Sequence, residues 1–387
     1  MEQKQWGVYV HIPFCRQKCF YCDFPSFAGR ERYMEEYVRA LCQEIAVRGS
    51  SYARRWGNPA TIYIGGGTPS ALPAALMEQL LLAIGTVFRP ADAQAEFTVE
   101  CNPGTVNAAY LAMMRIHGAN RLSFGVQSVD DGRLRRIGRI HDGQQAVQAV
   151  TMAKAAGFSN ISIDLMYGLP GQTLAQLKAS VGQALALEPA HISIYGLQLE
   201  EGTAFARMQE MGKLELPDDE AVEEMYDYMT EVLPAKGYER YEISNFARDG
   251  LASRHNLSYW QDVPYLGLGA AAHSYLEGQR WEAVAGIPDY IALIQAGRRP
   301  CEPEEPATRA IAMEEFAFLA LRTAAGISRQ QFQQKFGCSL DSVYQKAVQR
   351  LSAKGFLIDD GDAVRLTKLG MKYGNWAFEE FLLTEEE

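Results

Sequence analysis

The 387-residue chain is long enough for one large domain and a smaller one, and 48% of its residues are hydrophobic, as in ordinary globular proteins. Its formal net charge of −10 argues against nucleic acid as a partner, because phosphate binding needs a basic surface. No apolar run approaches the ~18 residues of a membrane span, and the polar segment Met1–Trp6 leaves no room for a signal peptide. We therefore expect a cytoplasmic protein, with peripheral contact to a membrane left open.

The first predicted strand leads into a loop with three cysteines. The apolar run Val8–Ile12 predicts a strand that Pro13 stops, and Cys15, Cys19 and Cys22 follow with C-x3-C-x2-C spacing. Three thiolates on one loop can bind three irons of a [4Fe–4S] cubane and leave the fourth iron open. A structural zinc site is the rival interpretation, but it needs a second cysteine pair that this sequence does not provide. Buried core thiols are a further alternative, against which the polar residues between the cysteines argue.

The cysteine loop and its flanks resemble a known signature. Tyr9 begins the run Y-x-H-I-P-F before the first cysteine, Tyr21 precedes the last one, and the pair D-F follows it. This motif resembles the signature of the radical S-adenosylmethionine (SAM) superfamily. Its flanking residues resemble those of the coproporphyrinogen dehydrogenase-like branch of that superfamily, which includes heme chaperones. The resemblance implies a [4Fe–4S] cluster on the three cysteines, SAM on the open iron, and cleavage of SAM to a 5′-deoxyadenosyl radical. It also implies that Tyr9 and Tyr21 lie at the cofactor site.

Strand-like and helix-like stretches alternate up to about residue 200, which predicts a parallel sheet covered by helices. The predicted strands are Val8–Ile12, Thr61–Ile64, Glu96–Glu100, Arg121–Val126, Asn160–Leu165 and His191–Tyr195. The predicted helices are Arg32–Arg48, Leu72–Val87, Ala108–His117, Gly143–Ala156 and Leu174–Leu187. Periodicity alone leaves a doubly wound sheet and a barrel both open. The resemblance implies an α/β fold of the partial (β/α)6 radical-SAM barrel type.

The resemblance also assigns a SAM site near the ends of the predicted strands, where barrels collect their functional residues. The family's contacts with SAM correspond here to Gly66, Gly67, Thr68, Glu100, Gln127, Arg139 and Asp164. The residues alone also allow simpler interpretations. The glycines could belong to an ordinary strand-to-helix turn, Glu100 could be a solvated acid in a turn, and Arg139 could be an exposed surface arginine. Asp164 stands apart, because a carboxylate inside an apolar strand is costly unless it has a partner. We assign no catalytic residue from the sequence.

A second informative stretch is H-N-L-S-Y-W, in which His255, Tyr259 and Trp260 fall within six residues. A lone histidine is more often a hydrogen-bonded core or surface residue than a ligand. Here the histidine nitrogen could ligate heme iron while the two aromatic rings pack on the macrocycle. The motif H-N-x-x-Y-W also resembles the one that heme chaperones of this branch link to heme binding.

The sequence divides into three expected segments. Residues 1–236 form the radical SAM domain, residues 237–302 a connecting segment with the H-N-x-x-Y-W motif, and residues 303–387 a small carboxy-terminal domain. Predicted helices at Glu314–Thr323, Ser328–Phe336 and Leu340–Ala353, followed by a hairpin that turns at Asp360–Asp362, indicate a winged-helix shape. Nine lysines and arginines against eleven acids between residues 310 and 387 oppose DNA binding, so we interpret this domain as a packing or substrate-covering module.

The leading functional hypothesis is a heme chaperone on a radical-SAM scaffold, which passes heme to a recipient hemoprotein such as a respiratory cytochrome. Its cofactors would be the cluster, SAM and heme, with a reducing partner for the cluster. The alternatives are oxygen-independent coproporphyrinogen III dehydrogenase, by radical decarboxylation, and a radical SAM enzyme with another substrate. Two differences argue against the dehydrogenase. That enzyme has a further cysteine where this chain has Phe24, and its segment before the residue that corresponds to Tyr9 is longer than the eight residues found here.

Overall fold

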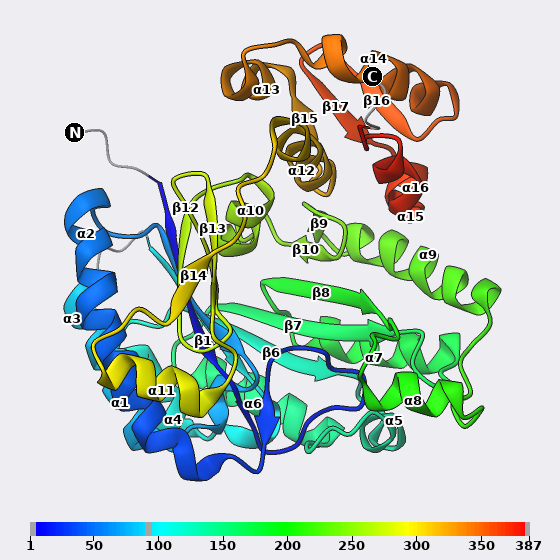
Figure 1. Cartoon of the computed structure of the whole chain (residues 1–387). Helices are drawn as coiled ribbons and strands as arrows, with labels where there is room; N and C mark the ends of the chain where they lie inside the picture. The colour runs from blue at the N-terminus through cyan, green and yellow to red at the C-terminus, as the bar shows by residue number, and fades with distance from the viewer. Residues whose placement is uncertain (1–4, 90–94, 384–387) are drawn as a thin grey trace.

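The computed structural model describes residues 5–89 and 95–383, and within these residues twelve strands form one sheet (Figure 1). The strand order is β14-β13-β12-β11-β1-β4-β5-β6-β7-β8-β10-β9. Residues 1–4, on which the expectation about a signal peptide partly depends, lie outside the described residues.

The centre of the sheet is a run of parallel strands that neighbour one another in chain order. They are β1 (Gly7–Ile12), β4 (Thr61–Gly66), β5 (Glu96–Cys101), β6 (Arg121–Gln127), β7 (Asn160–Tyr167) and β8 (His191–Gly196). Helical crossovers between consecutive strands produce this order. The sheet stays open, since β14 and β9 are its two edges. The expected partial (β/α)6 radical-SAM barrel is confirmed.

Helices connect the strands and cover their outer face. They are α1 (Met34–Glu44), α2 (Ser50–Trp56), α3 (Ala74–Phe88), α4 (Ala108–Ile116), α5 (Asp131–Arg136), α6 (Gly143–Ala155), α7 (Leu174–Ala186), α8 (Ala204–Glu210) and α9 (Asp219–Ala235). Short 3-10 turns occupy Glu31–Tyr33, Pro69–Ala71 and Pro103–Thr105. The single helix expected over Arg32–Arg48 is instead a 3-10 turn, α1 and the π-helical segment Ile45–Gly49.

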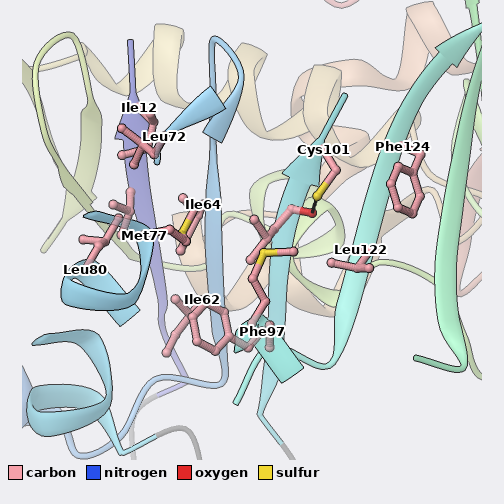
Figure 2. Packing of buried hydrophobic residues seen from close by; sticks show 14 of the residues in the cluster. Ile12, Ile62, Ile64, Leu72, Met77, Leu80, Phe97, Cys101, Leu122 and Phe124 are labelled. Carbon is pink, nitrogen blue, oxygen red and sulfur yellow. Dashed lines mark hydrogen bonds between the residues drawn. The ribbon is translucent and has the colours of Figure 1, made fainter. Parts of the chain in front are cut away.

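The strands alternate between an apolar face toward the helices and a polar face toward the barrel interior. Ile12, Ile62, Ile64, Phe97 and Leu122 pack together with side chains of α3 on the outer face (Figure 2). Because successive side chains of a strand point to opposite faces, the residues between them face inward. These inward positions carry polar side chains in β4 to β8, such as Thr61, Glu100, Ser123, Asp164 and Ser193. The hydrophobic core therefore lies outside the barrel and leaves its interior free for chemistry.

The segment over residues 237–302, expected to connect the two domains, also adds strands to the central sheet. It contains β9 (Glu239–Arg240), β10 (Asn245–Ala247), α10 (Arg254–Trp260), β11 (Tyr265–Leu268), β12 (His273–Leu276), β13 (Gln279–Ala283), α11 (Ile287–Gln295) and β14 (Cys301–Pro303). β11 pairs parallel with β1, and β10 pairs antiparallel with β8, so the segment extends the sheet on both sides.

The carboxy-terminal elements form a small domain with its own hydrophobic core. Its elements are α12 (Arg309–Leu321), β15 (Ile327–Ser328), α13 (Arg329–Phe336), α14 (Leu340–Ala353), β16 (Leu357–Asp359), β17 (Ala363–Leu366), α15 (Lys368–Lys372) and α16 (Gly374–Glu379). The strands pair in the order β15-β17-β16, which gives the expected winged-helix arrangement. Figure 1 shows these elements in orange and red beside α9, β9 and β10.

Ion pairs and backbone hydrogen bonds join this domain to the rest of the chain, and three examples show this. Lys335 contacts Asp262, Lys372 contacts Asp227 (Nζ to Oδ2, 2.8 Å), and the amide of Ile243 donates to a carbonyl oxygen at residue 322 (3.0 Å). Among the described residues, we find no helix with the length and apolar character needed to cross a membrane.

Candidate functional site: a cavity under the cysteine loop

A cavity of about 430 Å3 opens at the carboxyl ends of the parallel strands. Loops after consecutive strands supply its wall, as in other barrels of this kind, and its volume falls in the range of small-molecule sites. The sequence-predicted residues that line the cavity are Cys15, Cys19, Tyr21, Cys22, Gly66, Gly67, Thr68, Glu100, Gln127, Arg139 and Asp164. The structure thus brings together all but Tyr9 of the residues expected at the cluster and at SAM.

The cysteine loop is held so that its three thiols border this cavity. Lys18 stabilises the loop, because its Nζ donates hydrogen bonds to the carbonyl oxygens of Phe24 (2.9 Å) and Ser26 (3.2 Å). Burial raises the pKa of the Cys15 and Cys22 thiols. Bound iron would offset this cost, because a metal ion stabilises the thiolate form.

The three thiols at this cavity fit the three irons of a cubane that protein ligands can occupy. Among the described side chains, no group of three His, Cys, Asp or Glu residues is placed to share one metal ion. A cubane binds each thiolate through a different iron, so its sulfur ligands are spread more widely. Zinc, the rival interpretation of the cysteines, gains no support from this arrangement.

The glycine turn after β4 is close-packed against the cysteine loop. Gly66 has a φ of +112°, and a Cβ there would lie 2.6 Å from the His11 ring. At Gly67, a Cβ would lie 3.0 Å from Cys15 Sγ. Tyr9 Oη lies 2.9 Å from His11 Nδ1, so Tyr9 supports this turn from inside the barrel and does not line the cavity. Only glycine fits these positions without a shift of its neighbours, so close packing by itself requires the two glycines.

Two half-buried carboxyl groups lie on neighbouring parts of the wall. Glu100 accepts from Tyr63 Oη (2.6 Å) and from the Gly66 amide (3.2 Å), and burial raises its pKa to about 7. Asp164 accepts from Ser123 Oγ (3.2 Å), and burial also raises its pKa. Both groups therefore have the polar partners that a buried carboxyl needs.

Arg139 and Gln127 present polar atoms that the protein itself does not satisfy. Arg139 donates from Nη1 to Cys19 Sγ (3.5 Å) and from Nη2 to the Gly125 carbonyl oxygen, while its Nε has no hydrogen-bond partner among the described residues. Gln127 has a φ of +65°, and its Oε1 is likewise unpaired within the described part of the chain. Buried polar atoms without partners beside a cavity are typical of a ligand site.

The H-N-x-x-Y-W motif lies on α10, and its histidine packs against inward-facing residues of β1 and β4 without lining the cavity. His255 is 1% exposed, and its Nδ1 and Nε2 lie 2.8 Å from Thr61 Oγ1 and Tyr259 Oη respectively. Its ring stacks on Tyr63 at a centroid distance of 4.9 Å. Burial lowers the pKa of His255 to about 3. Ligation of heme iron by His255 would require breaking one of these bonds, and it stays a prediction.

The other residues of the motif take different positions. Asn256 lines the cavity, whereas His255, Tyr259 and Trp260 do not. The Arg322 guanidinium lies 4.6 Å from the Trp260 ring centroid, so Trp260 contacts the carboxy-terminal domain. The motif therefore connects the barrel interior to that domain.

Several residues that line the cavity were not predicted from the sequence. They are chiefly Tyr63, Arg121, Ser123, Ser193, Tyr195 and Asn256. Most of them occupy alternate positions of strands whose other residues are apolar. This period-two pattern was present in the sequence and could have identified them as inward-facing.

Comparison with known proteins places this geometry in a class. The pattern of the radical SAM superfamily matches residues 9–184, and that of the HemN C-terminal domain matches residues 307–372. Coproporphyrinogen III oxidase (HemN) of Escherichia coli, a radical SAM enzyme, has a similar structure, with a TM-score of 0.84 and 22% sequence identity over 98% of this chain and 90% of that one. The fold and site thus define a radical SAM scaffold with a HemN-type carboxy-terminal domain.

Relatives along the full length narrow the class to a family. Heme chaperone HemW of Bacillus subtilis is 40% identical over 378 residues, which cover 97% of this chain and 99% of the relative. The mitochondrial radical S-adenosyl methionine domain-containing protein 1 of Bos taurus is 32% identical over 94% of this chain and 84% of its own length. The chain belongs to the HemW family.

Proposed function

We propose that this protein is a heme chaperone, which binds heme and passes it to a recipient hemoprotein. The full-length similarity to the Bacillus subtilis protein named heme chaperone HemW is the observation that carries the proposal. The fold resemblance to coproporphyrinogen III oxidase does not favour the dehydrogenase reaction, because a likeness at 22% identity concerns the fold alone.

The cavity under the cysteine loop is the proposed site of a [4Fe–4S] cluster and SAM. Cys15, Cys19 and Cys22 would hold the cluster, which when bound and reduced supplies an electron to SAM. The unpaired Arg139 Nε suits a carboxylate such as that of SAM, since guanidinium–carboxylate bonds are charge-assisted. The carboxyl of Glu100 can accept from ribose hydroxyls. Asp164 would complete the polar wall, while the side chain of Lys18 fixes the loop.

Binding of both ligands can be tested on one preparation. After anaerobic reconstitution with iron and sulfide, SAM should perturb the paramagnetic resonance spectrum of the reduced cluster, and added hemin should give a saturable change in its Soret absorption. An unchanged resonance spectrum at saturating SAM would count against the SAM site. Unsaturable hemin absorption, equal to that with an unrelated protein, would count against the chaperone function.

A further inference from the structure

A second cavity, of about 480 Å3, lies between the barrel and the carboxy-terminal domain. The ends of β7 and β8 form one side, α9 forms another, and α15 with α16 forms the third. Gly196 and Gln198 line both this cavity and the one under the cysteine loop, so the two sites are neighbours. Cavities of this volume at a domain interface are common places for small molecules.

Aromatic rings make up much of its wall. Tyr167, Tyr226, Tyr373 and Trp376 line it, and the rings of Tyr167 and Tyr226 lie 6.3 Å apart between centroids. Trp376 is 68% exposed, an unusual position for the largest apolar side chain. These rings offer flat faces to a planar ligand, while polar side chains such as Gln198 and Asn375 complete the wall.

The cavity also offers a cation for an anionic edge. Arg322 lines it, and Arg322 Nε has no hydrogen-bond partner among the described residues. Lys372, the second cation of the wall, is bonded to Asp227 and Glu223. Arg322 also lies over the Trp260 ring, so this residue of the wall contacts the H-N-x-x-Y-W motif.

One phenol of the wall carries a cationic partner. Tyr226 Oη accepts a hydrogen bond from Arg240 Nη2 at 2.9 Å. Tyrosine is an axial ligand of heme iron in some proteins, and the Arg240 guanidinium fixes the position of the Tyr226 phenol oxygen through this hydrogen bond. The described residues of this wall include neither histidine nor cysteine. Its possible iron ligands are Met371 and three tyrosines, and we choose Tyr226 because its phenol oxygen accepts from a guanidinium.

We propose that this interdomain cavity is the heme site, with Tyr226 as the iron ligand and Arg322 facing a propionate. This proposal rests on the proposed chaperone function and locates the heme in the structure. It also separates the heme from the buried His255, whose ring nitrogens are both hydrogen-bonded.

The test is hemin titration of the reconstituted full-length protein and of its Tyr226→Phe variant, followed by Soret absorption and by paramagnetic resonance of the ferric heme. Phenylalanine keeps the ring and removes only the ligand oxygen. Tyr228→Phe is the matched control, because Tyr228 lies on the same helix, packs against the barrel core and lies under Lys178, outside the cavity. Iron and sulfide content, with circular dichroism, reports whether each variant is folded.

We expect Tyr226→Phe to weaken hemin binding at least about tenfold and to change the ferric spectrum, while Tyr228→Phe and His255→Ala keep the wild-type spectrum. Wild-type affinity and spectrum in Tyr226→Phe would overturn the inference and leave the chaperone function standing. A ferric spectrum that changes in His255→Ala would also overturn it, in favour of the motif histidine. Failure of the wild type to bind hemin would overturn the chaperone function as well.

Discussion

At the scale of single residues, Glu100 is the clearest example of a group whose chemistry is set by its surroundings. Burial raises the pKa of its carboxyl from 4.5 to about 7, against the opposing effect of the Tyr63 hydroxyl. The folded state therefore holds this proton more tightly than the unfolded state does. Its favourable contribution to folding is complete below pH 4.5 and is lost as the pH rises through about 7.

Glu100→Gln removes this titration and keeps an oxygen that accepts from Tyr63. We expect the free energy of unfolding of the variant, relative to wild type, to rise by about 2–3 kcal/mol between about pH 5 and about pH 8. Urea unfolding at both pH values measures it. Parallel pH dependences of the two proteins would show that Glu100 titrates normally.

The cysteines allow an equally sharp experiment. Serine in place of Cys15, Cys19 or Cys22 should abolish the broad visible absorption of the cluster, because each sulfur would hold its own iron. Cys338→Ser is the control, since Cys338 lies in the carboxy-terminal domain and contacts Arg309 (3.6 Å). Full iron content in all three loop variants would contradict the assignment.

At the scale of elements, α10 owes its position to a carboxylate on a neighbouring strand. Glu96 of β5 accepts hydrogen bonds from the amides of Arg254 and His255, both at 2.9 Å, and from Ser253 Oγ (3.4 Å). These donors are at the helix amino terminus, where the backbone amides have no partners within the helix. The strand thereby fixes the motif that follows.

Glu96→Ala should lower the free energy of unfolding by about 2–3 kcal/mol, because it leaves buried donors unpaired. Chemical denaturation measures the change, and Glu239→Ala, at an exposed position of β9, should have an effect near zero. Equal effects of the two substitutions would refute a capping role for Glu96.

The central strands and helices were largely predictable from the sequence, whereas the hydrogen-bond partners of His255 were not. The alternation of strand-like and helix-like stretches identified the central strands and helices nearly to their ends, because this signal is local. The strands of residues 237–302 are short, and those that join the central sheet, β10 and β11, pair with strands far away in the sequence, so their place in the sheet was not predictable from local pattern. His255 reads as a free ligand in the sequence, and only the fold shows that Thr61, some two hundred residues earlier, takes one of its nitrogens.

At the scale of the whole molecule, two cavities share the wall residues Gly196 and Gln198 at the end of β8, and the second of them also borders the carboxy-terminal domain. The proposed cluster and SAM occupy one and the proposed heme the other. This proximity gives a reason for a heme carrier to keep a radical-SAM scaffold, since the neighbouring cofactors can influence heme loading or release.

Transfer of heme is the measurement that tests the central claim most directly. The reconstituted protein, loaded with hemin and freed of excess, is mixed with a cytochrome apoprotein, and the Soret spectrum of the acceptor is followed alongside an assay with coproporphyrinogen III. We predict that heme moves to the acceptor faster than from an albumin control and that coproporphyrinogen III is not converted. No hemin binding, together with formation of protoporphyrinogen IX, would contradict the chaperone function and restore the dehydrogenase.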